Sequence, residues 1–248
     1  MGLPFGLSPG AGLFMALALF VAAFVRGYSG FGFAALSVTA SSLVTDPLHF
    51  VPLVILADAA MTLQQWRGIR SDIEWRRVLA LFAGALAGVP VGLWLFRRVG
   101  EDAARAAIAL FVLLMCAAML YGWRMARPMG RAAHTGAGAV SGLANAAAVG
   151  GLPVAVFFAA QAIGAAAFRA TLIMYFALLD LWTLTLMGSA GMVSHDTFLA
   201  AGLAAPVLFA GIWLGSRHFL STSPAEFRRF AILLLAGLSL IALGKSLV

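Results

Sequence analysis

The chain has 248 residues, of which 63% are hydrophobic and only 10% are charged, and its mean hydropathy is +1.01. A soluble domain carries about 25% charged residues, so this composition excludes an ordinary soluble protein. The formal net charge is +7. The basic residues lie in short links between apolar runs, where lysine and arginine set membrane orientation, so no nucleic-acid partner is expected.

Apolar runs of about 20 residues recur along the chain, which is the helix length needed to cross roughly 30 Å of hydrocarbon. Strands of a membrane barrel would alternate apolar and polar residues, and stretches such as Ala106–Tyr121 do not. We therefore expect an all-α integral membrane protein with one domain over residues 1–248. The first segment lacks a basic n-region and a cleavage site, so we expect it to be structural. The predicted segments cover approximately residues 11–45, 47–66, 78–96, 104–121, 136–166, 168–190, 197–214 and 227–247.

The second half of the chain resembles the first, and each half begins with a long interrupted segment. The order of the shared features predicts a duplication, with repeat 1 over about residues 1–124 and repeat 2 over about residues 132–248. Three features recur at offsets of 119, 122 and 124 residues: Gly92–Leu95 with Gly211–Leu214, Asp58 with Asp180, and Arg105 with Arg229.

The basic residues indicate how the segments cross. If all eight segments cross fully, the two sides receive nearly equal numbers and orientation is undecided. If both interrupted segments are re-entrant, one side receives eleven arginines and the other only Arg97, Arg98, Arg105 and Lys245. The positive-inside rule favours this second arrangement, with the arginine-rich side in the cytoplasm, and the two halves are then inverted repeats of three crossings each. The eleven are Arg67, Arg70, Arg76, Arg77, Arg124, Arg127, Arg131, Arg169, Arg217, Arg228 and Arg229.

Both interruptions are rich in glycine. The first, Val25–Phe33, has three glycines within six residues, and the second, Ser141–Pro153, ends in Gly150-Gly151-Leu152-Pro153. Glycine ends a helix, and proline suits the first turn of the next. Unwound backbone at membrane depth must be buried in protein or line a wet cavity, and helix N-termini there favour an anion. The glycines alone also fit tight helix packing. Two breaks at matching places favour a substrate site.

Polar residues beside the breaks extend this predicted site. A buried Arg26 would cost about 2.5–3.5 kcal/mol unless it is paired or wet. Guanidinium groups suit oxyanions, but Arg26 alternatively pairs with a carboxylate and Arg169 is alternatively a cytoplasmic anchor. The uncharged polar candidates bind substrate or satisfy freed backbone groups. The predicted substrate-binding residues are Arg26, Gly27, Tyr28, Ser29, Gly30, Gly32, Asn145, Gly150, Gly151, Pro153, Gln161 and Arg169.

Asp58 and Asp180 lie well inside apolar segments at corresponding repeat positions. An intramembrane carboxylate predicts a functional role, with proton relay the leading one, so both are candidates for proton coupling. Alternatively, each accepts hydrogen bonds from the broken segment of its own or the other half. Five tryptophans near segment ends are expected to be interfacial anchors: Trp66, Trp75, Trp94, Trp123 and Trp213.

These segments resemble the sulfite exporter TauE/SafE family, also called the TSUP permeases. The resemblance runs through Val25–Val38, Ser141–Phe158 and Phe168–Asp180. It implies transport of sulfite, thiosulfate or organosulfonates across the bacterial inner membrane, usually outward. It also implies that the break glycines, Arg26, Pro153 and Arg169 line or shape the path. The second motif departs from the family pattern, because Leu152 separates the glycine pair from Pro153.

The expected partners are a small anionic substrate and the lipid bilayer, and the sequence leaves homo-oligomerisation open. No cofactor or metal is expected, because no His/Cys/Asp cluster has ligand spacing. One alternative is a passive anion channel, since broken half-helices also build channels. A second is an intramembrane serine protease, because Gly27-Tyr28-Ser29-Gly30 fits a GxSG motif. The four histidines lie at segment ends or in loops, and a nucleophilic serine needs a nearby base, so no enzymatic activity is expected.

Overall fold

The computed structural model describes residues 3–122, 124–125, 129–219 and, near the C-terminus, 232–233, 236–237 and 239–241. All regular secondary structure within these residues is helical, which confirms the all-α class. The elements are a 3₁₀ turn η1 (Pro4–Gly6) and the helices α1 (Pro9–Ser29), α2 (Phe33–Ser41), α3 (Pro47–Ile69), α4 (Trp75–Phe96), α5 (Glu101–Tyr121), α6 (Arg131–Asn145), α7 (Gly151–Ala159), α8 (Ala165–Ser189) and α9 (His195–Phe219).

Six of the described helices are long and apolar enough to cross a membrane: α1, α3, α4, α5, α8 and α9. Five of them match predicted crossings, and α1 occupies most of the first interrupted segment. The last predicted segment, residues 227–247, lies largely outside the described residues. Trp123, Arg127, Arg228, Arg229 and Lys245 also lie outside them.

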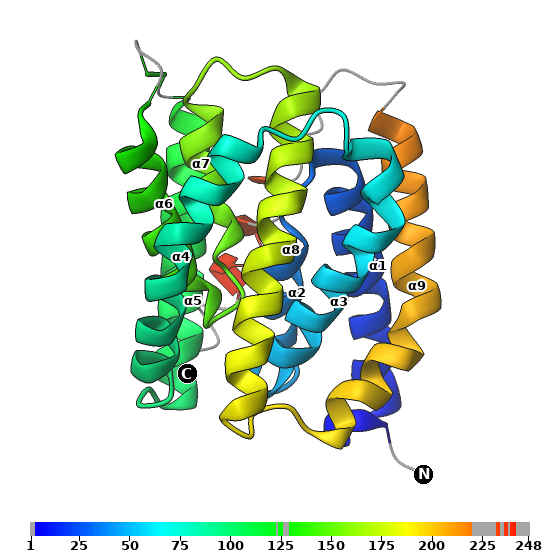
Figure 1. Cartoon of the computed structure of the whole chain (residues 1–248). Helices are drawn as coiled ribbons and strands as arrows, with labels where there is room; N and C mark the ends of the chain where they lie inside the picture. The colour runs from blue at the N-terminus through cyan, green and yellow to red at the C-terminus, as the bar shows by residue number, and fades with distance from the viewer. Residues whose placement is uncertain are drawn as a thin grey trace.

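The chain course can be followed in Figure 1. Helix α1 rises from the bottom of the view, α2 returns downwards, and α3, α4 and α5 run up, down and up. Helix α6 then descends from the top, α7 returns to the top, and α8 and α9 run down and up. Each predicted interruption is therefore a real break between two antiparallel helices. The first pair is connected to the rest of the chain at one end of the bundle and the second pair at the other.

The first break lies later in its segment than the glycine pattern suggests. Helix α1 has 21 residues and continues through Arg26 and Gly27, whereas α6 has only 15 residues. Gly27 lies within the helix, and its glycine is explained by the contact with α9: a Cβ atom there would lie 2.7 Å from the Ile212 carbonyl oxygen. For Gly27 the structure supports the alternative of tight helix packing.

Two helix pairs join the halves of the chain. Helix α6 packs closely on α4, and α1 packs closely on α9. Glycines permit both contacts, because a Cβ atom at Gly88 would collide with the Ala139 carbonyl and one at Gly215 with the Phe24 carbonyl. In each pair, the helix that precedes a break in one half rests on the second full crossing of the other half.

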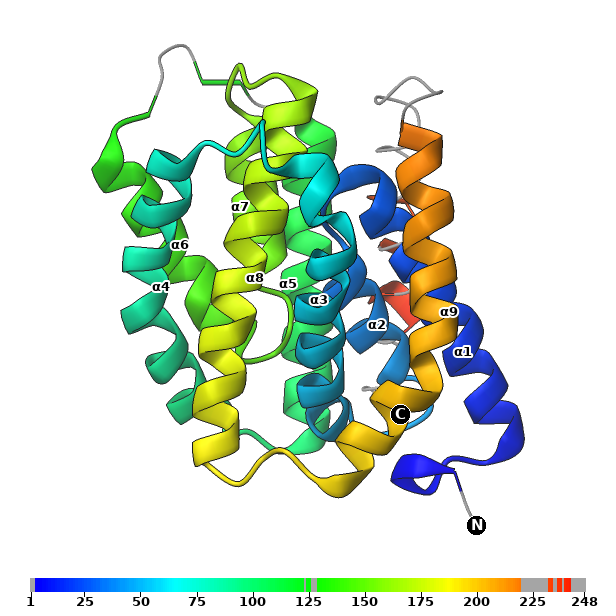
Figure 2. The ribbon, with the colours of Figure 1, turned by 45° about the vertical axis from the view of Figure 1, so that its right-hand side comes forward.

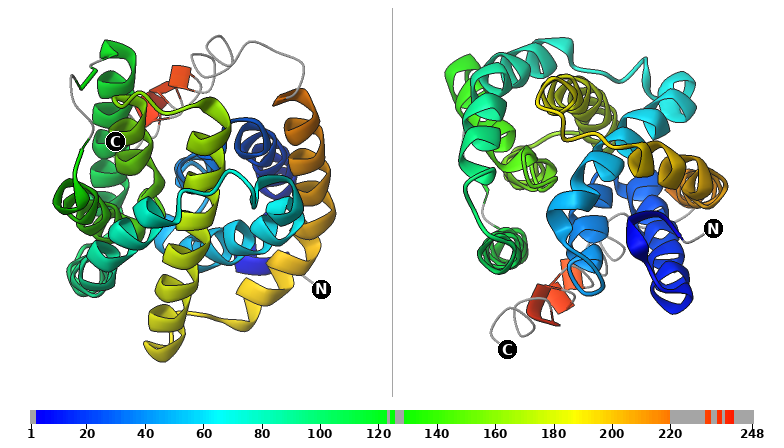
Figure 3. Two further views of the ribbon diagram at one scale, coloured as in Figure 1. Left: turned by 45° about the horizontal axis from the view of Figure 1, so that its top comes forward. Right: turned by 90° about the horizontal axis from the view of Figure 1, so that it is seen from below.

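The short helices that follow the breaks lie inside the bundle. Eight of the nine residues of α2 are buried, and α7 packs against α5, α6 and α8 (Figures 2 and 3). Four tryptophans lie on the surface of the bundle, as expected of interfacial anchors: Trp66, Trp75, Trp94 and Trp213. The guanidinium of Arg98 lies 3.8 Å from the ring centre of Trp94, and that of Arg217 lies 3.9 Å from Trp213. This arrangement recurs in both halves.

Candidate functional site

The two breaks have different backbones. In the first, Gly30 ends α1 at φ 82° and Gly32 begins α2 at φ 94°. Both angles lie in the left-handed region, which glycine adopts without a Cβ penalty. The second break spans residues 146–150, and its left-handed position is Ala148 at φ 55°. Helix α7 then begins at Gly151, with Pro153 in its first turn and half-buried.

Arg26 fastens the first break to α3. Its side chain is fully buried, and its Nε atom lies 2.5 Å from Asp58 Oδ1. The guanidinium also donates to the Asp58 carbonyl (3.3 Å), to Thr62 Oγ1 (3.0 Å) and to the Gly30 carbonyl (3.4 Å). Arg26 therefore pairs with a carboxylate, which was the alternative to substrate binding. Its partner, Asp58, belongs to the same half of the chain.

Asn145 has the corresponding place at the second break. It is the last residue of α6 and is 3% exposed. Its Nδ2 atom donates to Asp180 Oδ1 (3.1 Å) and to Thr183 Oγ1 (2.9 Å), both on α8. In each half, a donor at the end of the first broken helix thus contacts an aspartate and a threonine on the following full-length helix. The donor is charged in the first half and neutral in the second.

Both breaks contribute to one small pocket, which we term the central pocket. Its volume is about 10 Å³, which is room for about one water molecule. Helices α2 and α7 both start at this pocket, and neither has a side-chain cap at its N-terminus. The carboxyl groups of Asp58 and Asp180 both line it and interact with each other. The lining is Gly32, Ala34, Ala35, Asp58, Asn145, Ala148, Gly151, Leu152, Phe176 and Asp180.

Arg169 connects the second half of the chain to the first break. It is 9% exposed, and its Nη2 atom donates to the Gly27 carbonyl (2.6 Å) and to Ser216 Oγ (3.1 Å). Its Nε atom donates to the same Gly27 carbonyl (3.2 Å). A Cβ atom at Gly30 would lie 2.9 Å from Arg169 Cγ, so the side chain packs directly on the break. Arg169 is therefore part of the protein interior and not a surface anchor.

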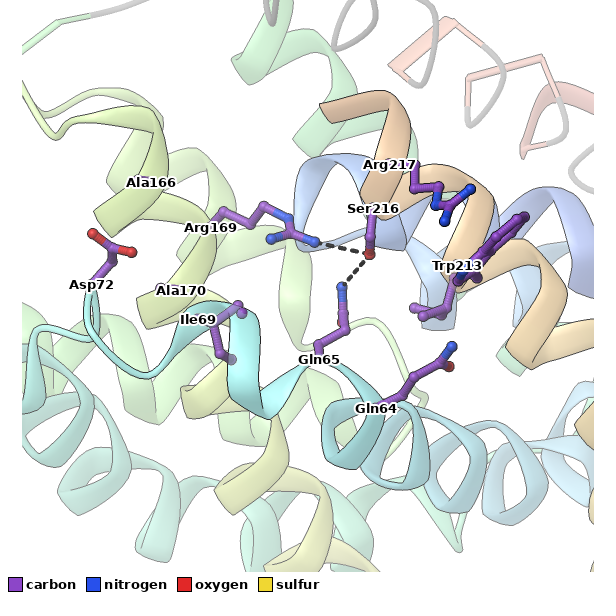
Figure 4. Close-up of a pocket in the computed structure, with 12 residues that line it drawn as sticks. Gln64, Gln65, Ile69, Asp72, Ala166, Arg169, Ala170, Trp213, Ser216 and Arg217 are labelled. Carbon is purple, nitrogen blue, oxygen red and sulfur yellow. Dashed lines mark hydrogen bonds between the residues drawn. The ribbon is translucent and has the colours of Figure 1, made fainter. Parts of the chain in front are cut away.

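A larger cavity, which we term the polar cavity, opens between α3, α8 and α9 beside Arg169. Its volume is about 460 Å³. In Figure 4 the side chains of Arg169 and Gln65 converge on the Ser216 hydroxyl, and Gln65 Nε2 lies 3.2 Å from it. The polar residues of the lining are Gln64, Gln65, Asp72, Arg169, Ser216 and Arg217.

A second cavity of about 190 Å³ is also lined by Arg169, and three further predicted residues line it: Tyr28, Ser29 and Gln161. The Ser29 hydroxyl lies within hydrogen-bond distance of the Val25 and Phe31 carbonyls and can donate to either, and Gln161 Nε2 donates to the Phe157 carbonyl. These bonds satisfy backbone groups, which was the alternative for these residues. Within the described part of the chain, Ser29 bonds to no histidine, so the geometry gives no support to a serine nucleophile.

Several residues of the site were missed by the sequence analysis. Thr62 and Thr183 follow Asp58 and Asp180 by one helical turn, and this spacing was a readable signal. Ser141 donates to the Gly150 carbonyl and accepts from the Tyr175 hydroxyl (2.8 Å). These two bonds connect the second break to α6 and α8. Gln65 and Ser216 lie 151 residues apart along the chain, and only the packing of α3 on α9 brings them together.

The comparisons with known proteins agree with this architecture. The sequence profile described as sulfite exporter TauE/SafE matches residues 15–242. A protein of Cupriavidus necator named probable sulfite/organosulfonate exporter TauE is 31% identical over 197 residues, covering 76% of this chain and 74% of the relative. A protein of Comamonas testosteroni named probable inner membrane transporter protein TsaS is 28% identical over 199 residues, covering 76% and 81%. No solved structure gives a significant match. The chain belongs to the sulfite exporter TauE/SafE family and is a membrane transporter, not an enzyme.

Proposed function

We propose that this transporter exports small sulfur-containing oxyanions, such as sulfite, thiosulfate or organosulfonates, across the bacterial inner membrane. We further propose that the substrate passes between the two helix breaks at the central pocket. The name of the first relative supports sulfite and organosulfonates as substrates, and the name of the second supports the inner membrane. The geometry of the breaks supports an anion as the cargo.

One observation carries the proposal: two uncapped helix N-termini face the same pocket. The first-turn N–H groups of α2 and α7 have no side-chain caps, and residues of both first turns line the central pocket. Free N–H groups and the positive ends of helix dipoles favour an anion. Transporters built from broken helices use such N-termini to bind anionic groups near the bilayer midplane. The central pocket is too small for an oxyanion in this conformation, so the helices around it must separate to admit one.

We propose that the polar cavity is the cytoplasmic entrance to this site. The cavity lies at the end of the bundle that carries Arg67, Arg70, Arg76 and Arg77, and the positive-inside rule favours the cytoplasm for that end. Arg169 lies between this cavity and the first break, where it contacts Gly27 and Gly30. A guanidinium group binds tetrahedral oxyanions well, so Arg169 would receive the substrate before it reaches the pocket.

We also propose that the halves, about residues 1–124 and 132–248, are inverted repeats within one domain. Their broken pairs start from opposite ends of the bundle, and each pre-break helix packs on the other half. In transporters of this architecture, one repeat moves against the other around a fixed central site. Outward movement of one negative charge across about 100 mV releases roughly 2.3 kcal/mol, so the membrane potential favours export of a monoanion.

The test is a flux assay with the purified chain in liposomes loaded with sulfite, thiosulfate or an organosulfonate. We expect protein-dependent release of at least one of these anions, with a rate that saturates as its concentration rises. Release that does not saturate would identify a passive anion channel. No release of any of the three above empty liposomes would refute the proposed substrate class.

The same assay tests the role of Arg169. Loss of a charge-assisted hydrogen bond costs about 1.5–3 kcal/mol, so Arg169→Ala should weaken apparent affinity by about 10- to 100-fold. Arg70→Ala is the matched control, because Arg70 is exposed at the same end of the bundle and should leave the affinity unchanged. Equal effects of the two substitutions would remove Arg169 from the path.

A further inference from the structure

The two aspartates of the central pocket differ in how their charges are balanced. Asp58 forms an ion pair with Arg26. The same arginine donates to the hydroxyl of Thr62, and this hydroxyl lies within hydrogen-bond distance of the Asp58 backbone carbonyl. At Asp180, Asn145 stands where the arginine would be and donates to both the aspartate and Thr183, whose own hydroxyl donates to the Leu179 carbonyl and not to Asp180. Asparagine donates a hydrogen bond without carrying a charge. The first carboxylate is therefore neutralised by its own half of the chain, and the second is not.

Asp180 also has an oxygen atom without a donor. The residue is 3% exposed, its Oδ1 atom accepts from Asn145, and its Oδ2 atom has no hydrogen-bond donor among the described residues. No ion pair joins Asp180 to a cationic side chain in the described part of the chain. A buried carboxyl group without a cationic partner takes up a proton in preference to remaining charged.

The groups around Asp180 strengthen this argument. The titratable or charged groups that face it are Asp58 on α3, Arg26 on α1 and Tyr175 on its own helix. The Tyr175 hydroxyl is directed to Ser141 and does not donate to Asp180. The single positive charge of Arg26 balances the negative charge of one of the two carboxylates. With both aspartates ionised, the group carries one net negative charge, which repels an incoming anion; with Asp180 protonated, it is neutral.

We infer that Asp180 carries a proton whenever an oxyanion occupies the central pocket, so that the transporter binds its substrate and one proton together. The proton comes from water and forms an O–H bond at Asp180 Oδ2, and it returns to water when the anion leaves. This inference rests on the proposed function, since it names the ion that accompanies the anion. It also changes the driving force: a monoanion that moves with one proton carries no net charge, so the concentration gradients of the anion and the proton, and not the membrane potential, set the direction of transport. It distinguishes Asp180 from Asp58, which the sequence analysis treated as equivalent.

The sign of the pH dependence follows from linkage. A falling pH increases the protonated fraction of Asp180 and removes the negative charge, so anion binding should strengthen. By reciprocity, anion binding must draw protons into the protein. On the alkaline side of the titration, one linked proton weakens binding by up to about tenfold per pH unit. If Asp180 had no part in binding, anion affinity would stay independent of its protonation.

The experiment measures proton uptake when purified protein in weakly buffered detergent solution binds an anion. The probe is methanesulfonate or thiosulfate, because both stay ionised near neutral pH and any proton taken up belongs to the protein. At alkaline pH, where Asp180 of the substrate-free protein is ionised, we expect the wild type to take up about one proton per anion bound. Asp180→Asn should still bind, without uptake and without pH dependence, and Asp180→Glu should restore both. Asp102→Asn, at an exposed carboxyl group, is the matched control and should behave as wild type.

The outcomes separate this inference from the proposed function. Anion binding by the wild type without proton uptake would overturn the inference and leave the transport proposal intact. Undiminished uptake in a folded Asp180→Asn variant would also overturn it. If no sulfur oxyanion binds or is transported, the proposed function fails first. On the acidic side of the titration Asp180 is protonated without substrate, and the infrared carbonyl band of its carboxyl group gives an independent readout. The band should be lost in Asp180→Asn, and its persistence there would contradict the inference.

Discussion

The two helix breaks share a hydrogen-bonding plan but differ in charge and in backbone chemistry. At the first, Arg26 forms a buried ion pair with Asp58, and glycines occupy the left-handed positions. At the second, Asn145 contacts Asp180 without charge, and Ala148 occupies the left-handed position. The first break is thus held by the ion pair between Arg26 and Asp58, and its left-handed backbone requires glycine. The second is held by neutral bonds, and within the described residues its aspartate has no cationic partner.

The largest predicted effect tests the charge difference. Asp58→Asn leaves Arg26 fully buried without its carboxylate, and removal of one partner from a buried ion pair costs about 3–5 kcal/mol. Asp180→Asn replaces a carboxyl group that has no cationic partner with a neutral group of similar shape, so we expect a change below about 1 kcal/mol. Thermal unfolding of both variants in detergent measures this. Equal losses would contradict the assigned difference between the aspartates.

The second prediction concerns the left-handed glycine of the first break. Gly30→Ala introduces a Cβ atom at φ 82° and 2.9 Å from Arg169 Cγ. The left-handed conformation alone costs about 1–2 kcal/mol for an alanine, and the contact adds to it. The melting temperature should therefore fall, and transport should fall with it because Arg169 is displaced. Gly68→Ala is the control: no neighbouring atom lies within 4 Å of a Cβ atom there, so stability should hold or rise.

The contrast between the breaks also explains what the sequence could predict. Both breaks were predictable, because glycine and proline act on the backbone where they stand. The role of Gly27 was not, since it depends on the approach of α9 from 185 residues away along the chain. Arg26 and Asp58 were each identified as buried charges, but their pairing requires α1 and α3 to lie side by side. The charge asymmetry at Asp180 became visible only after Asn145 was seen to occupy the position that corresponds to Arg26.

The third prediction tests how firmly Asn145 holds the second break. Asn145→Ala removes the hydrogen bonds to Asp180 and Thr183. Thr183 keeps its bond to the Leu179 carbonyl, so among the described contacts Asp180 Oδ1 is the acceptor that loses its donor. A buried polar group without its partner costs about 1–3 kcal/mol, so the loss should be smaller than that of Asp58→Asn. Thermal unfolding of the two variants under identical conditions gives the order. A larger loss at Asn145 would mean that neutral bonds, and not the ion pair, dominate the stability of the breaks.

The smallest predicted effect is that of Ala148→Gly, the reverse of the change at Gly30. Glycine at φ 55° relieves about 1–2 kcal/mol of backbone strain. The unfolded chain gains entropy worth about 0.4–1 kcal/mol, and a buried methyl group worth about 0.8 kcal/mol is lost, since Ala148 is fully buried. These contributions nearly cancel, so the melting temperature should change little. A loss as large as that of Gly30→Ala would show that Ala148 is required for packing at the central pocket, and the two breaks would then depend equally on the residue at their left-handed positions.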